Sequence, residues 1–120
     1  MLEDSRLPPI GSKALEAIDA AMVALHLRYH GREPASSHTQ MMGDDLLACL
    51  MGNPYTDVEK TMIELQRKAQ VHETRSAFQQ AMEQRFIGAV EKHTGRRVLK
   101  FMSAHHVGPD IELELFMLEG

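Results

Sequence analysis

Residues 54–95 have the sequence PYTDVEKTMIELQRKAQVHETRSAFQQAMEQRFIGAVEKHTG, and the strongest local signals of the chain lie there. Thr56 and Glu59 form a T-x-x-E capping box, in which each side chain bonds to the other residue's backbone N–H, so a helix begins there. Gly95 suits the left-handed residue that ends a helix. Between these ends, apolar residues recur at helical spacing. The first apolar stripe comprises Val58, Met62, Leu65 and Ala69, and the second comprises Phe78, Met82, Phe86, Ala89 and Val90.

The length of this stretch limits how it can fold. One helix from Asp57 to Thr94 would be about 57 Å long at 1.5 Å per residue, whereas a compact domain of 120 residues is roughly 35 Å across. Either the chain bends between about Gln66 and Thr74 and makes two helices, or one helix overhangs and packs against a second copy. We expect two helices.

The segment before this stretch predicts another helix. Ser12 stands where an N-cap belongs, and Gly31 ends the pattern. The apolar seam between them is Leu15, Ile18, Met22, Leu25 and Tyr29. Two heptads are too few for a free coiled coil, so a core-facing helix is favoured over a helical dimer seam. Residues 1–10 contain two prolines and no periodicity, which indicates a flexible lead-in to a single domain over residues 11–120.

Two antiparallel hairpins are predicted on either side of the long stretch. Residues 37–42 and 46–51 flank the polar turn at 43–45, and residues 97–104 and 110–118 flank the turn at 105–109. The strand at 46–51 is apolar throughout, which predicts burial on both faces and a central place. The expected fold is therefore α+β: an antiparallel sheet of about four strands with two or three helices on one face.

The last strand also bears on oligomeric state. Ile111, Leu113, Leu115 and Met117 fall on one side of it, and Glu112 and Glu114 share the other side with Phe116 and Leu118. Its far end is apolar on both sides, so a helix or a second subunit must cover it. A homodimer built through the sheet is the resulting hypothesis.

Composition restricts the class of protein. Thirteen basic and seventeen acidic residues give a net charge of −4, with both signs interleaved, which argues against nucleic-acid binding. The longest apolar run, LLACLM, is far too short to span a bilayer, so direct membrane insertion is not expected. The acidic N-terminus does not resemble a secretory signal. The lone Cys49 indicates a buried thiol in a reducing compartment, for which the cytoplasm is the simplest choice.

Candidate chemistry is sparse. His105 and His106 near one predicted turn, and His38 with Asp44 and Asp45 near the other, would offer mixed nitrogen and oxygen ligands if the hairpin ends met. Neither predicted hairpin contains an H-x-x-x-H or C-x-x-C spacing, Gly-Asp-Asp is ordinary turn composition, and we expect neither a metal nor a cofactor.

Arg75, beside Glu73, could anchor an anion or a partner's carboxylate, although a surface or partly buried ion pair is the simpler interpretation. No assembled nucleophile, P-loop or dinucleotide motif is present, so no catalytic residue and no enzyme activity are expected. The residues with which a ligand or partner contact would be made are Arg32, Asp44, Asp45, Arg75, His105, His106 and Asp110.

Several motifs, taken in order over residues 12–119, resemble the MpsC-like family of small bacterial domains. They are Y-x-G-R at Tyr29 to Arg32, Asp44-Asp45-Leu46, T-x-x-E-K at Thr56 to Lys60, V-x-E-x-R at Val71 to Arg75, T-G-R-x-V at Thr94 to Val98, and P-D-I-x-x-x-x-F-x-L at Pro109 to Leu118. Glu33 replaces a glycine that is usual in the family, which weakens any anion-binding role for that loop. Gln66 and Lys68 replace further glycines, which removes expected helix breakers.

The resemblance implies a component of a sodium-linked system that generates a membrane potential, connected with inorganic carbon uptake. It implies no catalytic residue. The resulting hypothesis is a non-enzymatic cytoplasmic accessory domain that acts through protein contacts, with a membrane-transport protein as one partner. The alternative is a regulatory module that binds a small ligand, a metal or nucleic acid.

Overall fold

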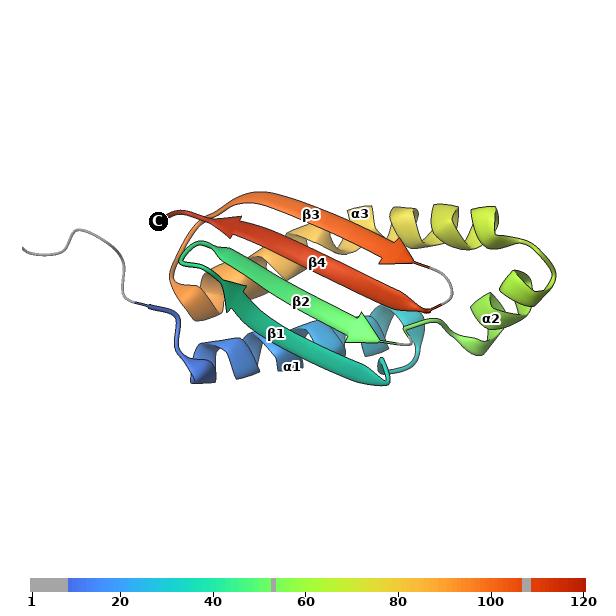
Figure 1. Cartoon of the computed structure of the whole chain (residues 1–120), viewed down its shortest axis with the longest axis horizontal. Helices are drawn as coiled ribbons and strands as arrows, with labels where there is room; N and C mark the ends of the chain where they lie inside the picture. The colour runs from blue at the N-terminus through green and yellow to red at the C-terminus, as the bar shows by residue number, and fades with distance from the viewer. Residues whose placement is uncertain (1–8, 53, 107–108) are drawn as a thin grey trace, which may run out of the picture.

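The structure is a computed structural model that describes residues 9–52, 54–106 and 109–120. Three helices and four strands make up this described part of the chain (Figure 1). In chain order they are α1 (Ser12–His30), β1 (Ser36–Met42), β2 (Leu46–Gly52), α2 (Asp57–Glu64), α3 (Lys68–Thr94), β3 (Val98–His106) and β4 (Ile111–Leu118). The predicted lead-in falls largely on residues 1–8, outside the described residues.

The four strands form one antiparallel sheet in the order β1-β2-β4-β3. Each predicted hairpin is present, and the two join where β2 pairs with β4, so β2 is central as expected. Helices α1 and α3 lie side by side behind the sheet in the view of Figure 1 and cover one face of it. The predicted α+β fold is confirmed.

Two helices occupy the long stretch, as expected. Thr56 caps α2: its Oγ1 accepts from the Glu59 N–H at 3.2 Å, and its own N–H donates to Glu59 Oε1 at 2.9 Å. The helix stops because Gln66 adopts a left-handed backbone with φ of 62°. A residue with a side chain occupies this conformation at a cost of about 1–2 kcal/mol, so the missing glycine did not lengthen the helix.

The apolar stripe predicted on the first of these helices is not part of the core. Val58 is 70% exposed and Leu65 is 67% exposed. Helix α2 packs against α3 and lies beyond the end of the sheet, so it has no sheet face to bury these residues against (Figure 1). The second stripe was predicted correctly in its central part, where Met82, Phe86 and Val90 are buried.

The ends of the long helices also test the prediction. Gly31 and Gly95 both end helices with positive φ, at 79° and 69°, as predicted. At the start of α1 the N-cap is Gly11, not Ser12, and it makes no side-chain cap bond. On the predicted α1 seam, Ile18 and Met22 are fully buried, while the flanking members of the seam are partly buried against the core.

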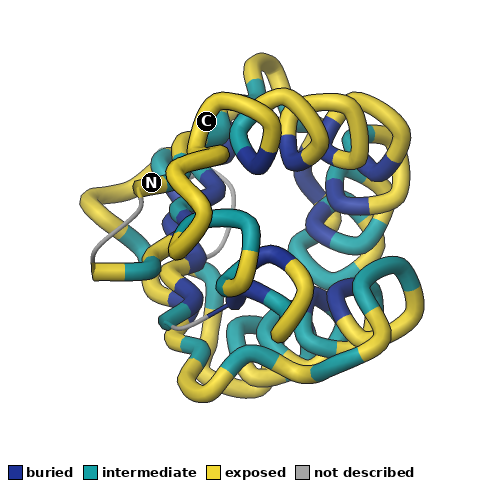
Figure 2. The backbone as a smooth tube through the Cα atoms, turned by 90° about the vertical axis from the view of Figure 1, so that its right-hand side faces the viewer, coloured by how far each residue is buried: buried dark blue, intermediate teal, exposed yellow. Residues whose placement is uncertain are grey.

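The hydrophobic core lies between the helices and the sheet, and buried positions of the chain turn toward this space (Figure 2). Strand β2 contributes Leu47, Cys49 and Met51, each 0% exposed. The prediction that β2 is buried on both faces holds only in part, because on its other face Ala48 is 7% exposed but Leu50 is 45% exposed. No helix in the described part of the chain covers that outer face.

Candidate functional site

Polar side chains gather on the inner face of the sheet, on strand β4. Because side chains alternate along a strand, Glu112 and Glu114 share a face with Phe116 and Leu118. The side chains of Phe116 and Leu118 are part of the core, so the carboxyl groups on the same face are buried with them. Glu112 is 2% exposed and Glu114 is 0% exposed.

Arg75 of α3 is the buried cation of this region and is 1% exposed. Its Nε donates to Glu59 Oε2 at 2.7 Å and its Nη2 to Glu59 Oε1 at 2.6 Å, a bidentate pair between α3 and α2. Nη2 also donates to the Pro54 carbonyl at 2.7 Å, and the guanidinium lies 4.8 Å from the centre of the Tyr55 ring. Glu112 Oε2 lies 3.8 Å from Nη1. A surface or partly buried ion pair was the simpler interpretation of Arg75; the ion pair is present, with Glu59 as its partner, but the arginine itself is fully buried.

Charge pairing sets the ionisation of these carboxyl groups. Burial alone would raise the pKa of Glu59, but hydrogen bonds from Arg75 and from the Thr56 N–H outweigh it and hold that pKa below its ordinary value. Glu112 has only the distant contact with Arg75, and burial raises its pKa. The cluster therefore holds an ionised Glu59 and a Glu112 that resists ionisation.

Two histidines of α1 complete the surroundings of Arg75. His26 Nε2 and His30 Nε2 both lie 3.4 Å from Arg75 Nη1, and a guanidinium nitrogen can only donate. Each imidazole is therefore neutral, and His26 holds its proton on Nδ1, which donates to the Arg32 carbonyl at 2.7 Å. Burial and then Arg75 lower the pKa of His30 to about 4, and burial lowers that of His26.

Among the described residues, no cation lies beside Glu114. Its Oε1 accepts from Gln79 Nε2 of α3 at 2.5 Å. Burial, followed by the neighbouring Glu112, raises the pKa of Glu114 to about 8, so the group is mainly protonated at neutral pH. Four buried oxygens in the described region lack a hydrogen-bond partner: Gln79 Oε1, Ser103 Oγ, Glu112 Oε1 and Glu114 Oε2.

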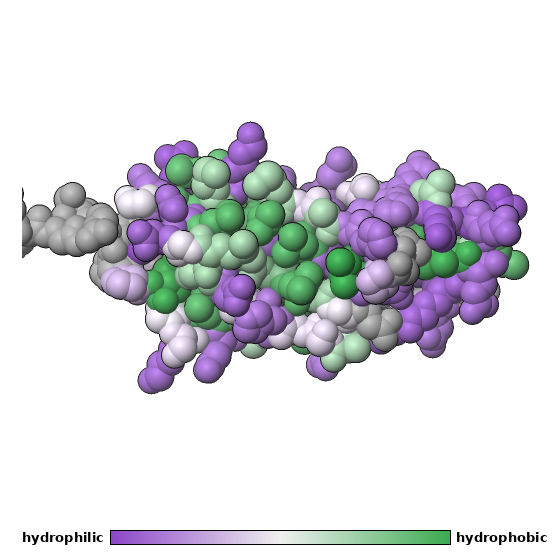
Figure 3. All heavy atoms as spheres, in the orientation of Figure 1, coloured by the Kyte–Doolittle hydropathy of each residue, from purple (hydrophilic) through white to green (hydrophobic). Residues whose placement is uncertain are grey.

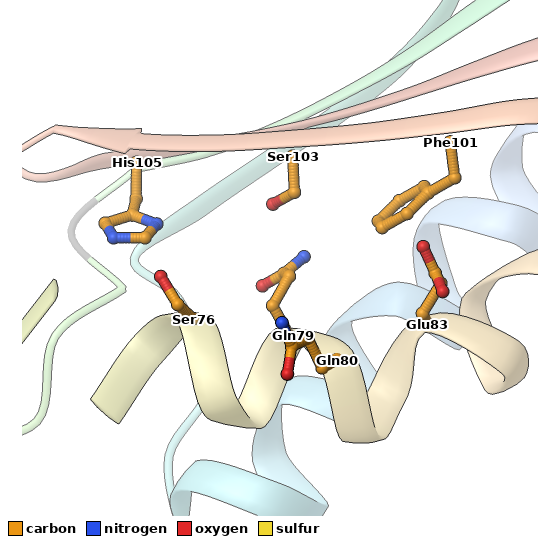
Figure 4. A pocket seen from close by; sticks show the side chains of 7 residues that line it. All are labelled: Ser76, Gln79, Gln80, Glu83, Phe101, Ser103 and His105. Atoms are coloured by element: carbon orange, nitrogen blue, oxygen red, sulfur yellow. The ribbon is translucent and has the colours of Figure 1, made fainter. Parts of the chain in front are cut away.

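A cavity of about 200 Å³ opens beside these groups, between α3 and β3. Its walls are formed by Ser76, Gln79, Gln80, Glu83, Phe101, Ser103 and His105. Figure 4 shows the Phe101 and His105 rings on β3 at opposite ends, with Ser103 between them and the Gln79 amide reaching up from α3. His105 stacks on His72, with ring centres 4.6 Å apart. Burial and then His72 lower the pKa of His105.

The two hairpin turns that could have formed a metal site do not meet. Leu46 pairs with Met117 and Gly52 with Ile111, so the turn at 43–45 and the connection after β3 lie at opposite ends of the sheet. Strand β3 runs to His106, so His105 and His106 belong to a strand and not to a turn. Among the described residues, no three histidine, cysteine, aspartate or glutamate side chains lie close enough to hold a metal ion together.

The structure distributes the other candidate residues over both ends. Asp44 accepts from Arg96 Nη1 through its carbonyl at 2.9 Å, and the Asp45 carbonyl accepts from the Leu118 N–H at 2.7 Å, so both act through the backbone. Arg32 donates to the Tyr55 carbonyl at 2.8 Å and meets Arg75 through His26. His106 accepts from the Tyr55 hydroxyl through its carbonyl, and the Pro109 carbonyl, next to Asp110, lies 3.1 Å from its Nδ1.

Sequence reasoning missed the groups that surround Arg75 and the cavity, namely His26, Glu59 as an ion-pair partner, Gln79, Glu112 and Glu114. A usable signal was present for two of them. Glu112 and Glu114 alternate in phase with Phe116 and Leu118, so whichever face buried the phenyl ring would bury the carboxyl groups as well. No such local signal connects Arg75 to Glu59.

These features define a class: a small two-layer α+β domain with a polar cluster inside its helix–sheet interface. Residues 12–120 match the family model described as the Na⁺-translocating membrane potential-generating system (MpsC). The chain belongs to this family, and the resemblance noted in its motifs is confirmed. Searches of the curated proteins and of the solved structures found no match. Within the described residues, no helix combines the length and the apolar character that crossing a membrane requires.

Proposed function

We propose that this protein is a non-catalytic cytoplasmic accessory protein that acts through protein contacts, as a homodimer joined at the outer face of its sheet. The single observation that supports the proposal is that this face is apolar and that no described helix covers it. The family description supports a partner in a system that generates a membrane potential. The buried Cys49, whose pKa burial raises to about 11, is compatible with a reducing compartment.

The outer face has the composition of an interface centre. Strands β2 and β4 contribute only uncharged side chains to it: Leu46, Ala48, Leu50, Ile111, Leu113, Leu115 and Met117. Leu50 and Met117 are 45% and 43% exposed, and Met102 on β3 adds a further 43% exposed side chain. Apolar residues gather over the strands in the space-filling view, whereas hydrophilic ones cover the end with α2 (Figure 3). A contiguous apolar surface of this kind marks a binding face.

A second copy of this chain is the occupant that the chemistry favours. The centre of the face carries no charge, so it offers nothing to select a charged partner, and an uncharged apolar face is complementary to itself across a twofold axis. Two sheets pack face to face with their strands aligned within about 30° or crossed near 90°.

The size of the face limits how strong such a dimer can be. Four strands about 4.8 Å apart, each about seven residues long at 3.3 Å per residue, present roughly 19 by 23 Å. Two such faces cover roughly 900 Å² before the relief of the side chains is counted, which is below the roughly 1,200 Å² of the smallest stable interfaces, so that relief must supply the rest. The helical side, with the exposed Val58 and Leu65 near α2, then remains free for the membrane-system partner.

The test compares two leucines of equal exposure on opposite sides of the molecule. Leu50 on the outer face is 45% exposed and Leu27 on α1 is 44% exposed. In sedimentation velocity at micromolar concentration, we expect wild type and Leu27→Glu at twice the 13.5 kDa chain mass and Leu50→Glu at the chain mass. Wild type that sediments only as a 13.5 kDa species, or a Leu50→Glu variant that still dimerises, would remove the proposal.

A further inference from the structure

We infer that the edge of β1 binds an extended segment of another protein as an added strand, whose lysine or arginine side chain enters the cavity between α1 and β1. The strand edge lies in the plane of the sheet, whereas the proposed dimer uses the outer face. The inference therefore stands or falls separately from the dimer.

Strand β1 lies at an edge of the sheet (Figure 1). Among the described strands it pairs only with β2. Every second residue of such a strand directs its backbone N–H and C=O away from the neighbouring strand. No backbone group of another described segment bonds to these groups in Ser36–Met42. An unpaired row of this kind is a template for a further strand.

The opposite edge of the sheet is protected against pairing, and β1 is not. The register of β3 against β4 shifts between Val98 and Lys100, and Lys100 is exposed. Irregularities and exposed lysines on an edge strand both hinder the addition of another strand. Strand β1 has the sequence SSHTQMM, without proline, lysine, arginine, aspartate or glutamate, and its register with β2 is continuous. Strand β1 is therefore the edge that is open to an added strand.

A cavity of about 420 Å³ lies beside this edge, between α1 and β1. Its walls come from the N-terminal half of α1, including Leu15, Glu16 and Asp19, and from residues 37–39 of β1. Side chains alternate between the two faces of a strand, so every second side chain of an added strand points to the side of α1. In strand addition, backbone bonds supply affinity, and pockets for alternate side chains supply specificity. The cavity is placed to be such a pocket.

The charge of the cavity selects a basic side chain. Its walls carry two carboxyl groups, those of Glu16 and Asp19, and no lysine or arginine. Asp19 Oδ1 accepts from Ser37 Oγ and Thr39 Oγ1, each at 2.7 Å, and no described donor bonds to its Oδ2. Leu15 adds an apolar wall, which suits the alkyl stem of a lysine or arginine. A basic side chain therefore meets both an apolar surface and opposite charge.

A second copy of this chain is less well suited to the edge. Pairing of β1 with β1 of another copy offers no lysine or arginine to either cavity, because SSHTQMM contains none. It would also bring Glu16 and Asp19 of the two copies toward each other, and like charges across an interface are unfavourable. A segment of a different protein, with a basic residue between apolar ones, is the occupant that the chemistry favours.

The experiment is an NMR titration of the full ¹⁵N-labelled chain with the capped peptide TVTKTVT, which is as long as β1. We expect saturable amide shifts centred on residues 12–20 and 36–42. The peptide TVTETVT reverses the charge, and TVPKPVT keeps it but lacks two backbone N–H donors. We expect no saturable shifts from either of these two controls.

Three results would overturn the inference. They are the absence of saturable shifts with TVTKTVT, equal shifts with either control peptide, and shifts centred on residues 111–117 of the outer face. Amide hydrogen exchange of the free chain tests for a second copy at the edge. We expect only alternate amides of residues 36–42 to be protected, and protection of all of them would show that another copy already fills the edge.

Variants place the peptide's lysine. Glu16→Gln removes one exposed carboxylate and should weaken TVTKTVT binding about two- to five-fold. His38→Lys puts a lysine on the edge strand beside the cavity and should weaken binding at least about fivefold by charge repulsion. Glu73→Gln, which changes an exposed glutamate of α3, is the matched control and should bind as wild type does. Unchanged affinity in either of the first two variants would contradict the placement of the lysine in the cavity.

Discussion

Both faces of the sheet carry apolar side chains, but only the inner face also buries carboxyl groups. The inner face, which α1 and α3 cover, holds two carboxyl groups, Glu112 and Glu114. The outer face, which no described helix covers, presents leucine, isoleucine and methionine. The two carboxyl groups of the inner face can be buried only with specific polar partners. The apolar side chains of the outer face can be buried by any apolar surface of complementary shape.

The inner face uses its polar groups to hold separate elements together. The bidentate pair of Arg75 and Glu59 ties α3 to α2, and the bond from Arg75 to the Pro54 carbonyl ties both to the segment after β2. Helix α2 lies beyond the sheet and exposes Val58 and Leu65, so apolar burial contributes little to its position. A buried ion pair contributes little net stability but forms only when its two groups are in a specific geometry. We therefore infer that the Arg75–Glu59 pair specifies where α2 docks.

The largest expected effect comes from removing the inner-face cation. Arg75→Met leaves Glu59 buried without its partner and should lower the free energy of unfolding by about 3–5 kcal/mol in urea titrations. Arg85→Met, on the exposed face of the same helix, should change it by no more than about 0.5 kcal/mol. If the two variants are equally stable, the ion pair does not hold α2 in place.

An intermediate effect concerns the carboxyl group without a cation. The unfolded chain ionises Glu114 near the ordinary pKa of 4.5, and the folded protein near 8. The folded state holds more protons between these values, so stability falls as pH rises through this window. Glu114→Gln should remove this fall and stabilise the protein at pH 9 by about 2–3 kcal/mol relative to wild type.

The control for this prediction is Glu119→Gln, which changes an exposed carboxylate just after β4. Its curve of unfolding free energy against pH should run parallel to that of wild type. A Glu114→Gln variant whose curve also runs parallel to wild type would mean that Glu114 ionises normally in the folded protein.

The smallest expected effect on the free energy of unfolding comes from comparing substitutions on the two faces of strand β1. Thr39 on the inner side of β1 is 8% exposed and donates to Asp19 Oδ1 of α1 at 2.7 Å. Thr39→Val keeps the shape, loses this bond and should cost about 1 kcal/mol. Gln40→Val, at the next position on the exposed side, should stay within about 0.5 kcal/mol of wild type. If both variants lose the same free energy of unfolding in chemical denaturation, the inner-face hydrogen bond of Thr39 does not contribute to stability.

Much of the fold was predictable because its signals are local. The capping box at Thr56, the glycines at 31 and 95, and the polar turn at 43–45 each act through neighbouring backbone groups, and each lies where it was predicted. The stripe at Val58 and Leu65 failed for the opposite reason. An apolar period on a helix shows which face is apolar, but not whether another element is there to cover it.

The candidate site was predictable only in part. Arg75 and His105 were chosen from their residue types, and they lie respectively in the buried cluster and in the wall of the cavity. Asp44 and Asp45 were chosen in the same way but lie at the other end of the sheet, because the β2–β4 register separates the two turns. Residue type indicates which side chains could bind or react, but only the strand register decides which of them lie close together.

The sequence by itself determined the order of the helices and strands, the helix ends marked by Thr56, Gly31 and Gly95, and which residues of β4 share a face, since these depend on local backbone geometry and on the two-residue period of a strand. The tertiary structure alone decided which face the helices cover, that Arg75 pairs with Glu59 sixteen residues away, and that Gln79 of α3 meets the buried Glu114 of β4. The reason is physical: the free energy of burying a polar group depends on the partner it meets, and that partner comes from another element of the fold.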